Sequence, residues 1–310
     1  MKTIDRINYL NVALIFLSCI LAYITPYYLL VFSYAALGPA HYLTQISWLH
    51  DRKYFTSEKY TPLFLALITM AIMLPLGLSN GFLMMTGIFV ALILIFPLTR
   101  LQQFLALAAA VFWALLLSLY GPIAIFVGLL LPTVIHVFIF TLGFMWAGAL
   151  KDNSASGYMA IIALLVCATS FFVLPADWYI FGAMAHHPGI WFFHDVANYL
   201  ARILGTGHDE HGMTRVFGFL SFVYTYHYLN WFSKTRIIAW HEIPRQRAYA
   251  IGLVYAAALW FYFYDYEKGF YLLLFLSLLH VVLEFPLNWR TFGMIGSRLL
   301  SPASAPAKSL

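Results

Sequence analysis

The hydrophobic pattern of the chain is a series of long, uninterrupted apolar runs separated by short polar or turn-forming segments. Runs of about 17–25 apolar residues are typical of membrane-spanning helices, and the alternation that marks the strands of a membrane β-barrel is missing. Pro26 and the pair Gly121-Pro122 fall between runs, as helix-breaking residues do at tight connections. The pattern predicts ten spans, over residues 8–25, 27–49, 61–78, 82–97, 102–120, 122–149, 157–174, 213–232, 249–265 and 270–286.

The amino-acid composition supports this fold class. Hydrophobic residues make up 63% of the 310 residues and charged residues only 9%, which is far less charge than a soluble protein of this length carries. We therefore expect an all-α, polytopic transmembrane helical bundle. The two cysteines, Cys19 and Cys167, both lie inside apolar runs, which argues against a disulfide framework and a cysteine-based zinc site.

The distribution of Lys and Arg predicts the orientation in the membrane. With the N-terminus inside, fourteen of the seventeen Lys and Arg residues fall on the inner side, and only Arg202, Arg215 and Lys268 fall outside. Such an asymmetry follows the positive-inside rule, so we expect both termini on the cytoplasmic side of an inner membrane. The net charge of +5 reflects these basic loops rather than a nucleic-acid partner. The sequence does not indicate an oligomeric state.

One long outer connection interrupts the series of spans. We expect residues 1–290 to form a single transmembrane domain that carries an aromatic and His-rich outer loop at 175–212, followed by a tail at 291–310. Within the loop, residues 195–204 have the pattern of an amphipathic helix lying in the membrane interface. The loop histidines are either a second metal site or ordinary surface residues; they are His186, His187, His194, His208 and His211.

Four histidines fall inside four different predicted spans. His41, His227 and His280 lie about five to eight residues before the inner ends of their spans, which places them in one layer ~8–12 Å above the inner boundary. His136 lies somewhat deeper. An ionisable side chain is costly inside a bilayer and is there usually functional. We therefore expect the four imidazoles to form a metal site; the alternative is that each only hydrogen bonds a neighbouring helix.

Further polar residues accompany these histidines. Glu284 follows His280 by four residues and therefore shares its helix face. Such a carboxylate can fix the tautomer of a metal-bound imidazole. Imidazole ligation with open positions suits non-haem iron, with copper or zinc as alternatives. The predicted ligands also include two interfacial histidines, His50 and His241, and the predicted catalytic residues are Glu284, Tyr226 and Asn230.

The spacing of the histidines excludes the best-known membrane di-iron enzymes, because the HxxxH and HxxHH boxes of fatty-acid desaturases are absent. The segment Gly38-Pro39-Ala40-His41 and the layout of one histidine per helix resemble the bacteriorhodopsin-related-protein family of membrane carotene-cleaving dioxygenases. In that family a Gly and soon an Asp follow the histidine, whereas Tyr42-Leu43-Thr44-Gln45 follow here. The resemblance implies oxidative chemistry, as in carotenoid metabolism, at a single iron.

We accordingly predict a bilayer-embedded, His-ligated iron oxidoreductase that acts on an apolar lipid or isoprenoid. Two other functions are compatible with the same residues. The chain could be a b-type haem electron-transfer protein, with His136 and either His227 or His280 as axial ligands. It could also be a transporter that uses His280 and Glu284 as a proton relay. A purely structural subunit is a third alternative, in which replacing the histidines leaves chemistry unaffected.

Overall fold

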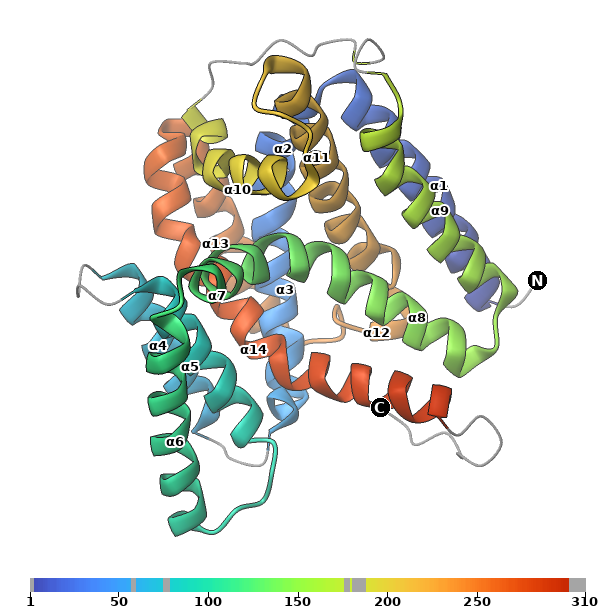
Figure 1. Ribbon diagram of the computed structural model, residues 1–310. Coiled ribbons are helices and arrows are strands. Elements are labelled where there is room, and N and C mark those ends of the chain that lie inside the picture. Colours follow the sequence, from blue (N-terminus) through green and yellow to red (C-terminus); the bar gives the residue numbers. More distant parts are fainter. Residues whose placement is uncertain (1–2, 57–59, 75–78, 176–178, 180–187, 301–310) are drawn as a thin grey trace. The chain divides into compact units, whose positions relative to one another are not determined.

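The computed structural model describes residues 3–56, 60–74, 79–175, 179 and 188–300 (Figure 1). Within these residues the chain forms helices and no strands, as the apolar runs predict. Each of the ten predicted spans coincides with helix over most of its length. Five helical segments are long and apolar enough to cross a membrane, namely α1 (Thr3–Ile24), α6 (Arg100–Ser118), the run from Gly121 to Asp152, α9 (Ala155–Val173) and α14 (Tyr266–Leu300).

The remaining helices are shorter or more polar than these five. The apolar helices α4 (Thr61–Met73) and α5 (Asn80–Ile93) have only 13 and 14 residues. By contrast, α11 (Glu210–Ser233) and α13 (Arg245–Tyr264) are long enough, with 24 and 20 residues, but their composition is more polar than that of the five. The helices thus fit a membrane protein, and the ten-span count with inner termini stays a prediction.

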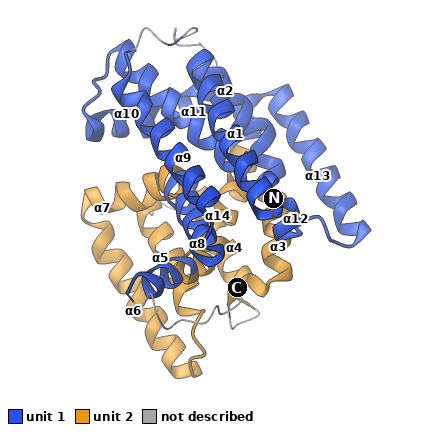
Figure 2. Cartoon of the chain, turned by 90° about the vertical axis from the view of Figure 1, so that its right-hand side faces the viewer, with its two compact units in different colours: residues 1–41, 137–270, 291–310 blue, residues 42–136, 271–290 orange. Residues whose placement is uncertain are grey.

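The chain divides into two compact units, coloured separately in Figure 2. Unit 1 comprises residues 1–41, 137–270 and 291–310. In it α11 packs against six other helical segments and is buried along nearly its whole length. The other helices that lie wholly in this unit are α1, α2 (Pro26–Phe32), η1 (Ser33–Leu37), α8 (Thr141–Asp152), α9, α10 (Pro188–Leu204), α12 (Thr235–Ile238) and α13.

Polar side chains explain how α11 can be central without being strongly apolar. The hydroxyl of Thr214 lies 3.0 Å from that of Tyr27, and the hydroxyl of Thr225 lies 2.7 Å from that of Ser33. Hydrogen bonds of this kind join helices that cannot rely on the hydrophobic effect within a bilayer. The polar residues that lower the hydropathy of α11 therefore link it to its neighbours.

Unit 2 comprises residues 42–136 and 271–290. Here α5 packs against α4, α6 and α7 (Gly121–Ile125). The contact is close at Gly81, where an added Cβ would lie 2.7 Å from the carbonyl oxygen of Ala124. The unit also contains η2 (Lys53–Phe55). Three helices have residues in both units: α3 (Gly38–Asp51), η3 (Phe126–Phe140) and α14.

Two segments extend beyond what the hydrophobic pattern indicates. The interfacial helix expected at 195–204 begins earlier, because α10 starts at Pro188, and its inward face buries Ile190, Phe193 and Ala197. The last helix continues from the predicted span at 270–286 to Leu300, with Pro286 inside it. The expected tail therefore includes helical residues 291–300, and residues 301–310 lie outside the described part of the chain.

Candidate metal centre

Widened, π-helical turns lie next to two of the four histidines. The π-helical segment η1 ends immediately before Gly38-Pro39 and thus four residues before His41. The second segment, η3, contains both Pro132 and His136. A proline within a helix lacks its N–H and clashes with a carbonyl of the preceding turn, and wider turns relieve that clash. Such turns also change the direction in which the residues that follow them point, and they occur frequently at functional sites.

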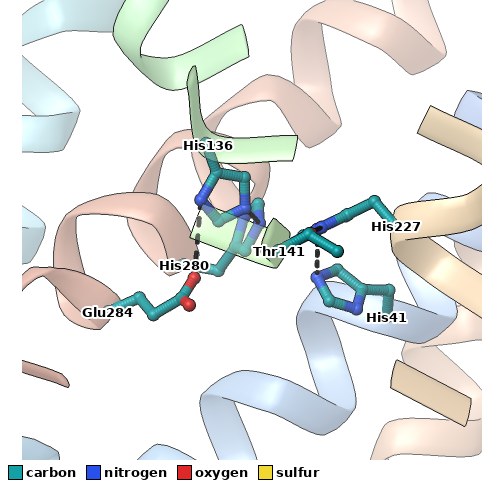
Figure 3. Close-up of polar contacts among 6 residues, drawn as sticks. All are labelled: His41, His136, Thr141, His227, His280 and Glu284. Atoms are coloured by element: carbon teal, nitrogen blue, oxygen red, sulfur yellow. Dashed lines mark hydrogen bonds and ion pairs between the residues drawn. The ribbon is translucent and has the colours of Figure 1, made fainter. Parts of the chain in front are cut away.

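Unit 1 brings His41 and His227 together. Their Nε2 atoms lie 3.1 Å apart, and the two rings meet edge to face (Figure 3). On the far side of His227, its Nδ1 atom lies 2.8 Å from the hydroxyl of Thr141. The His41 ring also contacts the rings of Tyr228 and Trp231, at centroid distances of 5.2 and 5.5 Å. The pair is therefore held by α8 and by aromatic side chains of α11.

Unit 2 brings His136 and His280 together in the same manner. Their Nε2 atoms also lie 3.1 Å apart. The Nδ1 atom of His136 faces the carboxylate of Glu284 at 3.4 Å (Figure 3). Glu284 also forms a hydrogen bond with the amide of Gln45. The carboxylate thus supports His136, which lies on another helix, and not the neighbouring His280 from which its role was predicted.

The four histidines, one facing pair in each unit, make up a group of buried potential ligands that could hold a metal ion. Each imidazole is at most 7% exposed. A metal ion bound at Nε2 needs the lone pair of that atom, so the proton must stay on Nδ1. The acceptor oxygens of Thr141 and Glu284 face Nδ1 of His227 and His136, where they stabilise that tautomer.

The two interfacial histidines lie outside this group. His50 is exposed, and its Nδ1 atom lies 3.3 Å from the hydroxyl of Tyr54. His241 is also exposed, and its ring is stacked edge-on against Trp240. Neither side chain contributes a ligand atom to the four-histidine group. Ligation by either residue therefore stays a prediction.

The outer-loop histidines are only partly described. His186 and His187 lie outside the described residues. In α10 the Nδ1 atom of His194 forms a 2.7 Å hydrogen bond with the Asn198 amide. His208 and His211 are exposed near the start of α11. In the described part of the chain, no group of metal-ligating side chains includes these three histidines.

The other two predicted catalytic residues belong to a different polar cluster. The hydroxyl of Tyr226 donates to the side-chain oxygen of Asn11 at 3.1 Å and lies 3.5 Å from that of Asn230. Tyr226 and Asn230 are four residues apart and share a helix face, whereas His227 is rotated by about 100° from Tyr226. This geometry gives the two residues a role in joining α11 to α1, and a catalytic role stays a prediction.

Thr141 contacts the imidazole of His227 but was not among the site residues predicted from the sequence. It lies five residues after His136 in an apolar run, and its sequence position carried no other signal. A hydroxyl in such a helix often hydrogen bonds only its own backbone. No protein-family model matches the chain, and no curated protein or solved structure matches it.

Proposed function

We propose that the protein is a membrane-embedded oxidoreductase whose metal ion, iron, is held by His41, His136, His227 and His280, and that it oxidises an apolar lipid or isoprenoid. The observation that carries this proposal is the burial of four imidazoles with facing Nε2 atoms in a chain of apolar helices. Burying one ionisable group in such surroundings is costly. Four together are stabilised if they share a cation.

The chemistry of the ligand set supports a redox metal. Imidazole suits iron, copper, nickel and zinc. Structural zinc sites more often use thiolates, and the two cysteines are on α1 and α9, where Cys19 contacts Ser170. Four neutral imidazoles leave the charge of the ion uncompensated, so Glu284, held against His136, supplies the nearby negative charge. Such an ion can bind and activate an oxidant while its surroundings exclude water.

The spacing within each pair favours a single compact ion over a haem. Two axial imidazoles bound to one iron at about 2.0 Å would place their nitrogens about 4 Å apart. The facing Nε2 atoms are instead 3.1 Å apart in both pairs. With bonds of about 2.1 Å, that separation corresponds to an angle of about 95° at the ion. Each pair therefore has the spacing of adjacent ligands.

The proton-coupled transporter is the second alternative. In this alternative, His280 and Glu284 pass a proton directly between each other. Within unit 2, however, His280 faces His136 and Glu284 faces the opposite nitrogen of the same ring. The carboxylate is thus in the position of a ligand-supporting group, which favours the metal site.

Metal analysis of the purified protein, together with its absorption spectrum, tests the proposal. We expect about one iron per chain, no Soret band, and loss of the metal when any one of the four histidines is changed to Ala. His50→Ala and His241→Ala are matched controls, because both residues are exposed, and both should retain the metal. A Soret band that depends on two of the histidines would establish the haem alternative, and a metal-free wild type would refute the metal site.

Activity requires a separate measurement. Membranes that contain the wild-type protein should consume dioxygen when an isoprenoid hydrocarbon is added, and the His227→Ala variant should not. Metal binding without any metal-dependent oxidation of lipid or isoprenoid substrates would leave the metal site standing and refute the oxidoreductase.

A further inference from the structure

A second polar cluster lies on α14 beyond the histidines. His280, Glu284 and Asn288 follow one another at intervals of four residues and therefore share one helix face. Glu284 and Asn288 are only 2% and 3% exposed. Gln45 of α3, itself 3% exposed, completes the cluster through its hydrogen bond to Glu284. The cluster belongs entirely to unit 2.

Several polar atoms of this cluster have no hydrogen-bond partner among the described residues. They are both polar atoms of the Asn288 amide and the side-chain oxygen of Gln45. Buried polar groups in proteins almost always have a partner, and an apolar environment supplies none. An amide with neither its donor nor its acceptor used, about two turns from a candidate metal site, indicates that a ligand supplies the missing bonds.

The kinds of free atom select the chemistry of that ligand. Gln45 and Asn288 offer acceptor oxygens, and the Asn288 amide also offers two N–H donors. A cation would bind the acceptor oxygens but leave the N–H groups unpaired. A carbonyl would accept from the N–H groups but leave the acceptor oxygens unpaired. A hydroxyl group both donates and accepts, so one such group on an apolar ligand satisfies both kinds of atom.

We infer that Asn288 and Gln45, beside Glu284, form a subsite that binds the hydroxyl group of an apolar alcohol. This inference rests on the proposed function, because it names the substrate class of the same site. The eight residues from His280 to Asn288 correspond to about 12 Å along the helix. A long-chain or isoprenoid alcohol bound through its hydroxyl at Asn288 would therefore extend its hydrocarbon chain to the level of the imidazoles.

Competition binding to the full-length protein in lipid nanodiscs tests the subsite. Radiolabelled 1-hexadecanol is displaced by unlabelled 1-hexadecanol or by hexadecane, each corrected for its partition into lipid. We expect the alcohol to compete at roughly 10-fold lower concentration than the alkane, because the alkane leaves buried polar groups unpaired. Equal competition by the two compounds would mean that only water occupies the cluster, and the inference would be wrong.

Substitutions assign the preference to the cluster. Asn288→Leu should reduce the affinity for the alcohol by about 10-fold and leave that for the alkane unchanged. Asn198→Leu, which removes an amide from α10, should leave both unchanged. If Asn288→Leu does not fold, Gln45→Leu replaces it, with the same expectation. An alcohol preference that survives in the folded variant overturns the assignment.

The iron content of each sample separates this test from that of the proposed function. Retained iron in Asn288→Leu shows that the variant is folded and that the histidine group is intact. A wild type that prefers the alcohol but contains no metal would refute the proposed oxidoreductase and leave the hydroxyl subsite standing. A wild type that contains iron but shows no preference for the alcohol would refute the hydroxyl subsite and leave the metal site standing.

Discussion

Replacement of Thr141 by Val should weaken metal binding although Thr141 is not itself a ligand. The two side chains have nearly the same shape, so the substitution removes the hydroxyl and leaves the packing of α8 intact. The hydroxyl lies 2.8 Å from Nδ1 of His227, a distance typical of a strong hydrogen bond. Its loss leaves the Nδ1–H of a ring that is 7% exposed without its acceptor.

The size of the effect follows from that geometry. Removing one partner of a buried hydrogen bond costs about 1–3 kcal/mol, and each 1.4 kcal/mol changes an equilibrium about tenfold. The Kd for the metal should therefore rise by roughly 5–150-fold. This range overlaps the about 10–100-fold loss seen when groups that support a metal-bound histidine are removed.

Competition with a chelator of known affinity measures the Kd in wild type and variants. Thr141→Ser keeps the hydroxyl and should bind the metal nearly as tightly as wild type. Thr225→Val is the matched control, because it removes a buried 2.7 Å hydrogen bond from α11 without touching a histidine; it should lower stability only. If Thr141→Val binds the metal as tightly as wild type, the tautomer argument for His227 is wrong.

Three further predictions concern the carboxylate, the helix packing and the topology. Glu284→Gln should lower metal affinity or activity by about 10–100-fold, measured as bound metal at limiting supply; full retention would show that the carboxylate only anchors α14. Gly81→Ala should destabilise unit 2 by about 1–3 kcal/mol in thermal unfolding, because its Cβ would lie 2.7 Å from a backbone oxygen of Ala124, whereas Gly148→Ala, with open space around it, should have little effect. A cysteine at position 240, with Cys19 and Cys167 replaced by Ser, should react with impermeant reagents only from the cytoplasmic side, and outside labelling would overturn the orientation.

The pattern of apolar and polar residues was enough to predict the helical class and to single out the histidines. Runs of apolar residues long enough to span a bilayer leave helices as the natural fold, since all backbone groups must be paired within each segment. Against that background, His41, His136, His227 and His280 stand out because an ionisable group in an apolar run has a high energetic cost. These inferences depend only on residue type and position along the chain.

Which side chains meet could be seen only once the helices were packed together. The direction of a side chain depends on the rotation of its helix, which packing and π-helical turns set, and neither can be counted from sequence. His41 therefore faces His227, and Glu284 faces His136 of another helix although His280 is its neighbour in sequence. For the same reason Tyr226 points to Asn11, about 100° from the direction of the adjacent histidine.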